Sequence, residues 1–300
     1  MKILSKFLIV VLLFSASLLL LFPFFPNKQV TERMRGGSSD DVIKSTQISQ
    51  VITKIESDYA GKDNLRVTQS PVYTYYMYGY QQVIMEYNLP VVNFSQSTFN
   101  THFLNTYGTT ISGTCTIVAA TEIINYYGTV KNDIQVYNRS VRSPGLLNYV
   151  YSIGNQPEDV FSAIFRMSRN NLYITNTSGT LNTVHDNILQ YSFNMFDSNN
   201  TIANTYTLVD NIKSETKNGR PVMFNVSNHT MVARGYVSFL VSYTETTGIL
   251  WWKKTNHYYN QVDYIIVDHG WSSSLYGYYP ASQLPNQNFL YNAQLITEVI

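Results

Sequence analysis

The sequence predicts an α+β protein in which a helical part and a part made of antiparallel strands each carry candidate functional residues. An amphipathic helix is expected from Thr114 to Gly128, because its apolar residues recur at helical spacing. Two strands joined by a tight turn are expected within residues 219–236. A further strand of apolar residues is expected to end at Asp268.

The amino terminus carries an apolar segment that predicts export. Lys2 and Lys6 precede an uncharged stretch from Phe7 to Asn27, which suits either a secretory signal peptide or an uncleaved signal-anchor helix. No good cleavage site occurs before Lys28, and both lysines lie on one side, so an anchor with a cytoplasmic N-terminus is favoured. We therefore expect residues 1–27 to be a leader. The remaining chain is expected to be secreted or held on the outer face of the membrane.

Residues 28–88 are expected to hold a linker and a candidate pro-segment. Arg35 to Asp41 is rich in glycine, serine and aspartate, as linkers are. Residues 42–59 have the spacing of an amphipathic helix, and residues 72–87, rich in tyrosine and β-branched residues, predict one or two strands. The region suits a pro-segment, and it equally suits a stalk followed by the first part of the folded domain. The main domain is expected over residues 89–300.

Composition limits the classes of function. The net charge is +1 and only 13% of residues are charged, which argues against nucleic-acid binding by a basic patch. Tyrosine is very common, with 25 residues, and asparagine is abundant, so the surface is expected to be polar but uncharged. Neither the spacing of zinc ligands nor a P-loop occurs in the sequence, so we expect no metal and no organic cofactor.

Cys115 is the only cysteine of the chain and stands at the start of the expected helix, with Thr114 as N-cap and Gly128 just beyond the C-terminal end. The positive end of the helix dipole favours the thiolate, which is the nucleophilic form. A lone cysteine is often only a small buried hydrophobic residue. An exported chain with one cysteine cannot form an internal disulfide, however, and a free thiol is open to oxidation. The chain is therefore expected either to use this thiol or to bury it fully.

The segment Gly113–Tyr127 resembles the nucleophile region of papain-like cysteine peptidases, in particular the streptopain family and the C39-like bacteriocin-leader peptidases. The resemblance extends over about residues 89–290 and implies a papain-like two-lobe fold, with the cysteine on a helical lobe and the His and Asp on a lobe of antiparallel strands. Upstream, Phe94-Ser95-Gln96 loosely matches an aromatic-x-Gln motif of streptopain-like enzymes. The resemblance implies that Gln96 and the Cys115 backbone N–H stabilise the oxyanion. Asn105 and Ser112 are rival donors.

His229 is the candidate general base. It follows Gly219-Arg-Pro-Val222 and a short expected strand, and it opens a second strand that ends in Gly235-Tyr236. The papain-like families share this arrangement, which implies that His229 faces the thiolate across the cleft. The pKa of histidine suits proton exchange near neutral pH.

Asp268 is the candidate orienting residue. Streptopain-like enzymes have Asn-Trp-Gly-Trp where this chain has Asp268-His-Gly-Trp271. The resemblance implies that Asp268 accepts a hydrogen bond from His229 and fixes its tautomer. His269, in place of the first tryptophan, is a rival base, although it is expected to point to the opposite face of the strand. Trp271 is expected to line the substrate cleft, together with Gly113 and Asn228.

The other segments predict structure rather than chemistry. Residues 157–167 are expected to form a helix that begins near Pro157. Residues 201–217 are expected to form another, with Val209 and Ile212 on its inner face. Residues 237–259 are expected to form an exposed β-hairpin, with contact to a substrate or surface as the alternative.

The resemblance as a whole implies a cysteine peptidase that cleaves a peptide or protein substrate, with its own pro-segment as inhibitor. Two alternatives stay open. One is a related acyl-transfer enzyme, such as an amidase, a leader peptidase or a transglutaminase-like protein. The other is a cell-surface binding protein that has the fold without the activity.

Overall fold

The computed structural model describes residues 67–69, 72–145, 148–172, 174, 182–205, 208–226, 229–249, 252–271, 276–281 and 293–298. The chain divides into two compact units, Met1–Arg35 and Gly36–Ile300, and every described residue lies in the second. The predicted leader, linker and helix within residues 1–59 lie outside the described residues. Among those that are described, no helix combines the length and the apolar character needed to cross a membrane.

The protein is mixed α+β, and all strand pairs in the described part of the chain are antiparallel. The main sheet has the order β1-β2-β7-β6-β10-β5, and β8 pairs with both β7 and β9. Its strands are β1 (Val67–Gln69), β2 (Val72–Asn88), β5 (Thr201–Thr205), β6 (Val222–Val226), β7 (His229–Ile249), β8 (Trp252–Asp268), β9 (Gly277–Pro280) and β10 (Ala293–Thr297). A separate small sheet pairs β3 (Arg139–Arg142) with β4 (Val150–Ile153).

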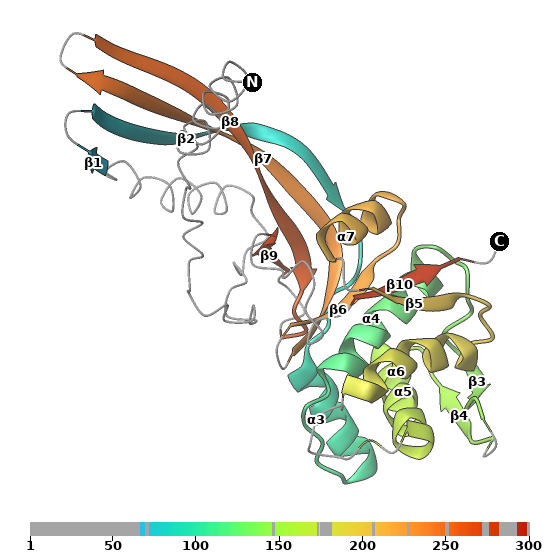
Figure 1. The fold of residues 1–300 in the computed structure, drawn as a ribbon. Coiled ribbons are helices and arrows are strands. Elements are labelled where there is room, and N and C mark those ends of the chain that lie inside the picture. The colour runs from blue at the N-terminus through green and yellow to red at the C-terminus, as the bar shows by residue number, and fades with distance from the viewer. Residues whose placement is uncertain are drawn as a thin grey trace, which may run out of the picture. The chain divides into compact units, whose positions relative to one another are not determined.

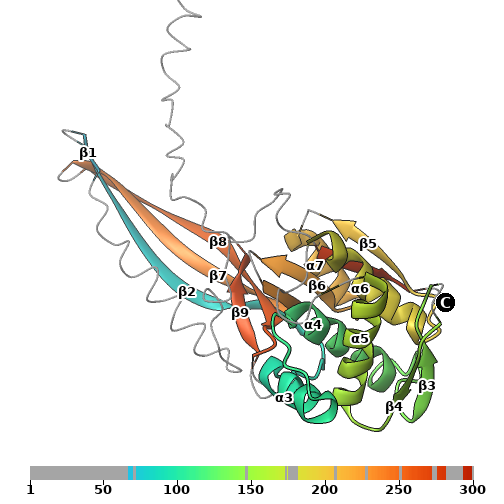
Figure 2. The same ribbon diagram turned by 90° about the horizontal axis from the view of Figure 1, so that it is seen from below.

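Strand β7 is the centre of the main sheet. Its first residues pair with β6, the rest of that edge pairs with β2, and its other edge pairs with β8 (Figures 1 and 2). The register of β7 against β8 shifts between Ala233 and Gly235. A Cβ atom on Gly235 would lie 1.9 Å from the carbonyl oxygen of Tyr87, so only glycine allows β2 to approach this closely. Residues 72–88, within the expected linker and pro-segment region, thus form a strand of the main sheet.

Side chains alternate between the two faces of the sheet, as strand geometry requires. Met223 and Val232 pack into the cluster that surrounds helix α4 (Cys115–Thr129). Their neighbours Phe224 and Met231 pack in a second cluster, with Ile212 of helix α7 (Leu208–Lys217). The helices α4 and α7 therefore cover opposite faces of the strands that carry the site.

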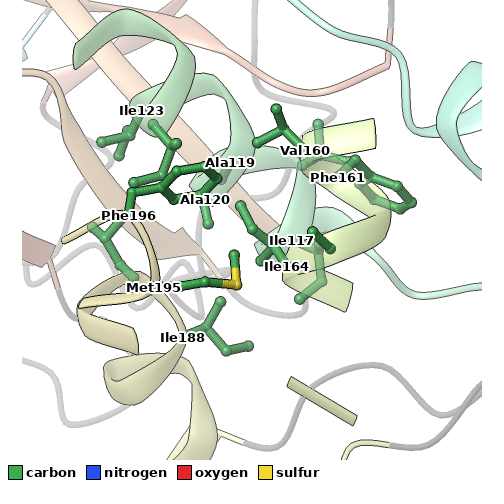
Figure 3. Packing of buried hydrophobic residues seen from close by; sticks show 14 of the residues in the cluster. Ile117, Ala119, Ala120, Ile123, Val160, Phe161, Ile164, Ile188, Met195 and Phe196 are labelled. Atoms are coloured by element: carbon green, nitrogen blue, oxygen red, sulfur yellow. The ribbon is translucent and has the colours of Figure 1, made fainter. Parts of the chain in front are cut away.

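Helix α4 lies in the middle of the larger cluster. Its apolar residues pack against α5 (Pro157–Leu172) and α6 (Asn182–Met195), as Figure 3 shows. Helix α3 (Gln96–Tyr107) adds Phe99 and Phe103 to the same core. Since both flanks of α4 are packed, the position of its first residue is fixed by the core.

Two expectations about helices are wrong. Residues 201–217 do not form one helix: strand β5 comes first, paired with β10, and α7 follows, with Ile212 buried on its inner face as predicted. Gly128 does not end helix α4, which continues to Thr129. A Cβ atom on Gly128 would lie 2.3 Å from Cγ2 of Val136, so this glycine allows close packing instead.

Candidate active site

Cys115 is the first residue of α4, as predicted. Gly113 has a φ angle of 65°, which turns the chain into the helix. Thr114 takes the N-cap position, but its hydroxyl donates to Oδ1 of Asn100 at 2.8 Å instead of capping the helix. The amides of the first helical turn have no partner within the helix, so they and the helix dipole favour negative charge at this point. Cys115 is only partly buried.

His229 is the first residue of β7, and its imidazole forms a hydrogen bond with the Cys115 thiol. Burial raises the pKa of Cys115, but the hydrogen bond and the positive charge of His229, helped by Thr230, outweigh it. The net effect lowers the pKa from 9.0 to about 7. Thr230 also ties the two elements together, because its hydroxyl lies 2.9 Å from that of Thr116 in α4. The predicted meeting of the sulfur and the imidazole is thus present in the structure.

The second ring nitrogen of His229 meets a backbone group and not the predicted carboxylate. Nε2 lies 2.8 Å from the carbonyl oxygen of His269. A carbonyl oxygen can only accept, so Nε2 carries the hydrogen in this contact. The Nδ1 atom is then left for the Cys115 thiol. This arrangement fixes the tautomer, which is the role expected of Asp268.

Asp268 ends β8 as predicted, but its carboxyl group is fully buried, and neither of its oxygens forms a hydrogen bond with His229. Its Oδ1 accepts a hydrogen bond from the amide of Gly270 at 2.8 Å. Gly270 has a φ angle of 69°, and a Cβ atom there would contact Val118 of α4 at 3.4 Å. The predicted hydrogen bond from Asp268 to His229 is therefore corrected: Asp268 shapes the turn whose backbone holds the imidazole.

Gln96 begins helix α3, and its backbone amide donates to the carbonyl oxygen of Gly270 at 2.8 Å. The preceding Ser95 caps the helix by accepting from the amide of Thr98, and its hydroxyl also donates to the carbonyl oxygen of Trp271 at 3.4 Å. These contacts place Gln96 beside the turn that holds His229, with its side chain partly buried. The rival Asn105 is exposed and lies further along α3 by about 13 Å of helix rise.

The predicted cleft residues have different outcomes. The ring of Trp271 lies over His229, with 5.1 Å between ring centroids, and it also contacts the ring of His269 at 4.8 Å. It therefore covers the hydrogen bond between His229 and the His269 carbonyl. Asn228 lies outside the described residues. His269, the rival base, is 1% exposed, and its Nδ1 accepts from the amide of Trp271 at 3.2 Å, so it takes part in the turn.

Sequence reasoning missed two buried charged residues beside the site, Glu122 of α4 and Arg234 of β7. Burial and the charge of Asp268 raise the pKa of Glu122 well above its usual range. Burial lowers the pKa of Arg234, although the nearby carboxyl groups oppose this. Both could have been recognised from their position in the sequence, because each interrupts an otherwise apolar segment. A charged residue that is buried in this way needs partners.

Comparison of the chain with protein-family models, with curated proteins and with solved structures finds no match. Within the described ranges, no group of three or more His, Cys, Asp or Glu side chains is arranged to hold a metal ion.

Proposed function

We propose that this protein is a cysteine peptidase of the papain-like kind, with a helical lobe around α4 and a lobe of antiparallel strands around β7. One observation carries the proposal: a partly buried thiol at a helix N-terminus is hydrogen-bonded to a histidine from a distant strand. A buried structural cysteine needs no such partner. A nucleophile paired with a base, whose other side is held by a third group, is the arrangement of covalent catalysis.

In the proposed reaction the Cys115 thiolate attacks the carbonyl carbon of a peptide bond, and the electron pair of the C=O bond moves to oxygen. The oxyanion lies at the start of α4, where the Cys115 N–H and the Gln96 side chain are the proposed donors. The imidazolium of His229 protonates the leaving nitrogen as the C–N bond breaks, which leaves a thioester. His229 then takes a proton from water, and the resulting attack releases the acid and restores the thiol.

The proposal includes export and autoinhibition. The apolar leader favours a secreted protein or one anchored to the outer membrane face. Because β1 and β2 belong to the main sheet, we place the candidate pro-segment before residue 67. Sequencing the amino terminus of the protein recovered from culture medium and from membranes tests both points. A mature chain that begins at residue 28 or earlier in every fraction would refute pro-segment removal.

A peptide-based electrophile tests the activity. The full chain is incubated at pH 7 with a peptidyl acyloxymethyl ketone, and the modified residue is located by mass spectrometry. We expect labelling at Cys115 that Cys115→Ser abolishes and His229→Ala slows. His257→Ala is the matched control, since His257 is exposed on the β7–β8 hairpin. Cleavage of a mixed peptide library by wild type and not by Cys115→Ser completes the test. Labelling no faster than that of a free cysteine, with no cleavage, would indicate a binding protein.

A further inference from the structure

Three buried charged side chains from three elements form a cluster that is linked to His229 through the turn after β8. Glu122 of α4 is 1% exposed, Asp268 at the end of β8 is 0% exposed and Arg234 of β7 is 8% exposed. Glu122 stands two helical turns after Cys115, so both side chains lie on the same side of α4. The cluster is thus part of the support on which the site is built.

The hydrogen bonds of Arg234 all go to uncharged groups. Its guanidinium donates to Oδ1 of Asn88 at 2.9 Å, to Oδ1 of Asn93 at 2.8 Å and to the carbonyl oxygen of Leu89 at 2.6 Å. Tyr276 covers the guanidinium, 4.8 Å from its ring centroid. Arg234 therefore fixes the segment that leads from β2 to α3 and acts on the two carboxyl groups only through its charge.

The two carboxyl groups need a proton between them. With both ionised, the cluster would carry a net negative charge in the interior, which is costly. Within the described part of the chain, no amide, hydroxyl or guanidinium group donates to Oδ2 of Asp268. Glu122 interacts directly with Asp268, and a protonated Glu122 supplies the missing donor. One proton thus neutralises the cluster and satisfies a buried oxygen.

Glu122 links both segments that adjoin the cysteine helix. Its Oε1 accepts a hydrogen bond from the amide of Phe94 at 3.1 Å, just before Gln96. Its partner Asp268 holds the amide of Gly270. The carbonyl groups of this same turn accept hydrogen bonds from His229 and from the Gln96 amide, each at 2.8 Å.

We propose that protonated Glu122 is a positioning residue, which holds the turn 268–271 and the segment 93–96 against α4 and so keeps the His269 carbonyl aligned with His229. This inference rests on the proposed function of Cys115. Glu122 does not touch the reacting atoms. It acts through Asp268, and its uncharged form is the one that the geometry requires.

Three variants test the role. Glu122→Gln keeps an acceptor for the Phe94 amide and a neutral donor for Asp268, so it imitates the protonated acid. Glu122→Ala removes both contacts. Ile123→Ala is the matched control, because it opens a cavity in the hydrophobic core beside the same helix and removes no charged side chain. The rate of Cys115 alkylation by iodoacetamide is measured from pH 5 to 10 on protein shown to be folded by circular dichroism.

Glu122→Gln is expected to stay within about threefold of the wild-type rate at pH 7 and to keep the Cys115 pKa at about 7. Glu122→Ala is expected to lose about four- to sixfold at pH 7, no more than the loss worked out below for removal of His229, with a raised Cys115 pKa, while folded Ile123→Ala resembles wild type. If Glu122→Ala does not fold, Glu122→Gln decides alone. A Gln variant that loses the low Cys115 pKa, or a folded Ala variant that keeps it, overturns the proposal. A wild-type thiol that titrates like free cysteine overturns the peptidase proposal instead. In that case the positioning of the turn is tested by the rate of hydrogen exchange at the Gly270 amide, which should be faster in Glu122→Ala than in Glu122→Gln; equal rates overturn the positioning role.

Discussion

The substitution His229→Ala should change how Cys115 titrates, because the low pKa of the thiol depends on that histidine. Burial raises the pKa of Cys115, and the hydrogen bond and charge of His229 are the largest effects that lower it, to about 7 from 9.0. Without the imidazole, burial is opposed only by Thr230 and by the start of α4. We therefore expect the pKa of Cys115 in His229→Ala to lie at or above 9.0.

The size of the effect on reactivity follows from two opposing terms. At pH 7 a thiol with a pKa of about 7 is half ionised, whereas one at 9.0 is about 1% ionised, a difference of about 50-fold in thiolate. The less basic thiolate is also less nucleophilic, by about eightfold over this range for a Brønsted coefficient of about 0.45. The net loss of alkylation rate at pH 7 is therefore about sixfold or more. At about pH 10, where most of both thiols is ionised, the order reverses and the variant reacts faster.

The assay is the rate of alkylation by iodoacetamide from pH 5 to 10, followed by mass spectrometry on the full chain. His257→Ala is the control, since it removes an exposed histidine from the same pair of strands. Two profiles that cross between pH 7 and 10 support the reasoning. Parallel profiles, or a wild-type inflection near 9, would refute the ion pair between Cys115 and His229.

Three further predictions concern the framework of the site. Gly235→Ala should lower the free energy of unfolding in urea by about 3 kcal/mol or more, because the new methyl group would meet the Tyr87 carbonyl at 1.9 Å. A decrease in the free energy of unfolding below about 0.5 kcal/mol contradicts the close approach of β2. Thr230→Val should raise the Cys115 pKa by less than His229→Ala does and should cost about 1 to 3 kcal/mol, since a buried hydroxyl with several hydrogen bonds is lost. The double variant Glu122→Gln/Asp268→Asn should gain stability relative to wild type as pH rises from 4 to 7. Burial raises the pKa values of both carboxyl groups, so the folded wild type retains the proton held by Glu122, whereas the unfolded chain releases it. Wild-type stability therefore falls over this range, by up to about 1.4 kcal/mol per pH unit for one retained proton. Equal pH dependence of the two proteins in urea unfolding would count against the raised pKa values.

Several features of the site could be predicted because local sequence determines them. Helix α4 begins at Cys115 because apolar residues recur at helical spacing from that point. Strand β7 begins at His229, and β8 ends at Asp268 where its apolar run stops. Each boundary is marked by residues within a few positions of it, and the sequence supplies those directly.

The role of Asp268 could not be predicted in the same way, because it depends on contacts between distant segments. In the structure Asp268 pairs with Val232, whose side chain packs in the cluster around α4. Paired residues of antiparallel strands point to the same face of a sheet, so the carboxyl group of Asp268 faces α4 and meets Glu122. Only the register of β7 against β8 determines this, and no local motif records it.

The wrong helix over residues 201–217 has a similar cause. Val209 and Ile212 have helical spacing, and α7 does form around them. The preceding residues 201–205 become a strand because β10, which lies near the C-terminus, pairs with them along their whole length. A partner so distant in sequence overrides the local preference, which is weak for so short a segment.

The departure at His269 from the streptopain-like pattern has a physical explanation in the way the imidazole is held. The acceptor for His229 is a backbone carbonyl, which every residue type provides, so this hydrogen bond does not depend on the type of side chain at position 269. The constraint moves to the residues that shape the turn. Gly270 must adopt a positive φ beside Val118, and Asp268 must hold its amide. A search for a carboxylate or amide that touches the histidine would therefore overlook such a site. A search for an apolar strand that ends in an aspartate, with a glycine two residues later, would find it.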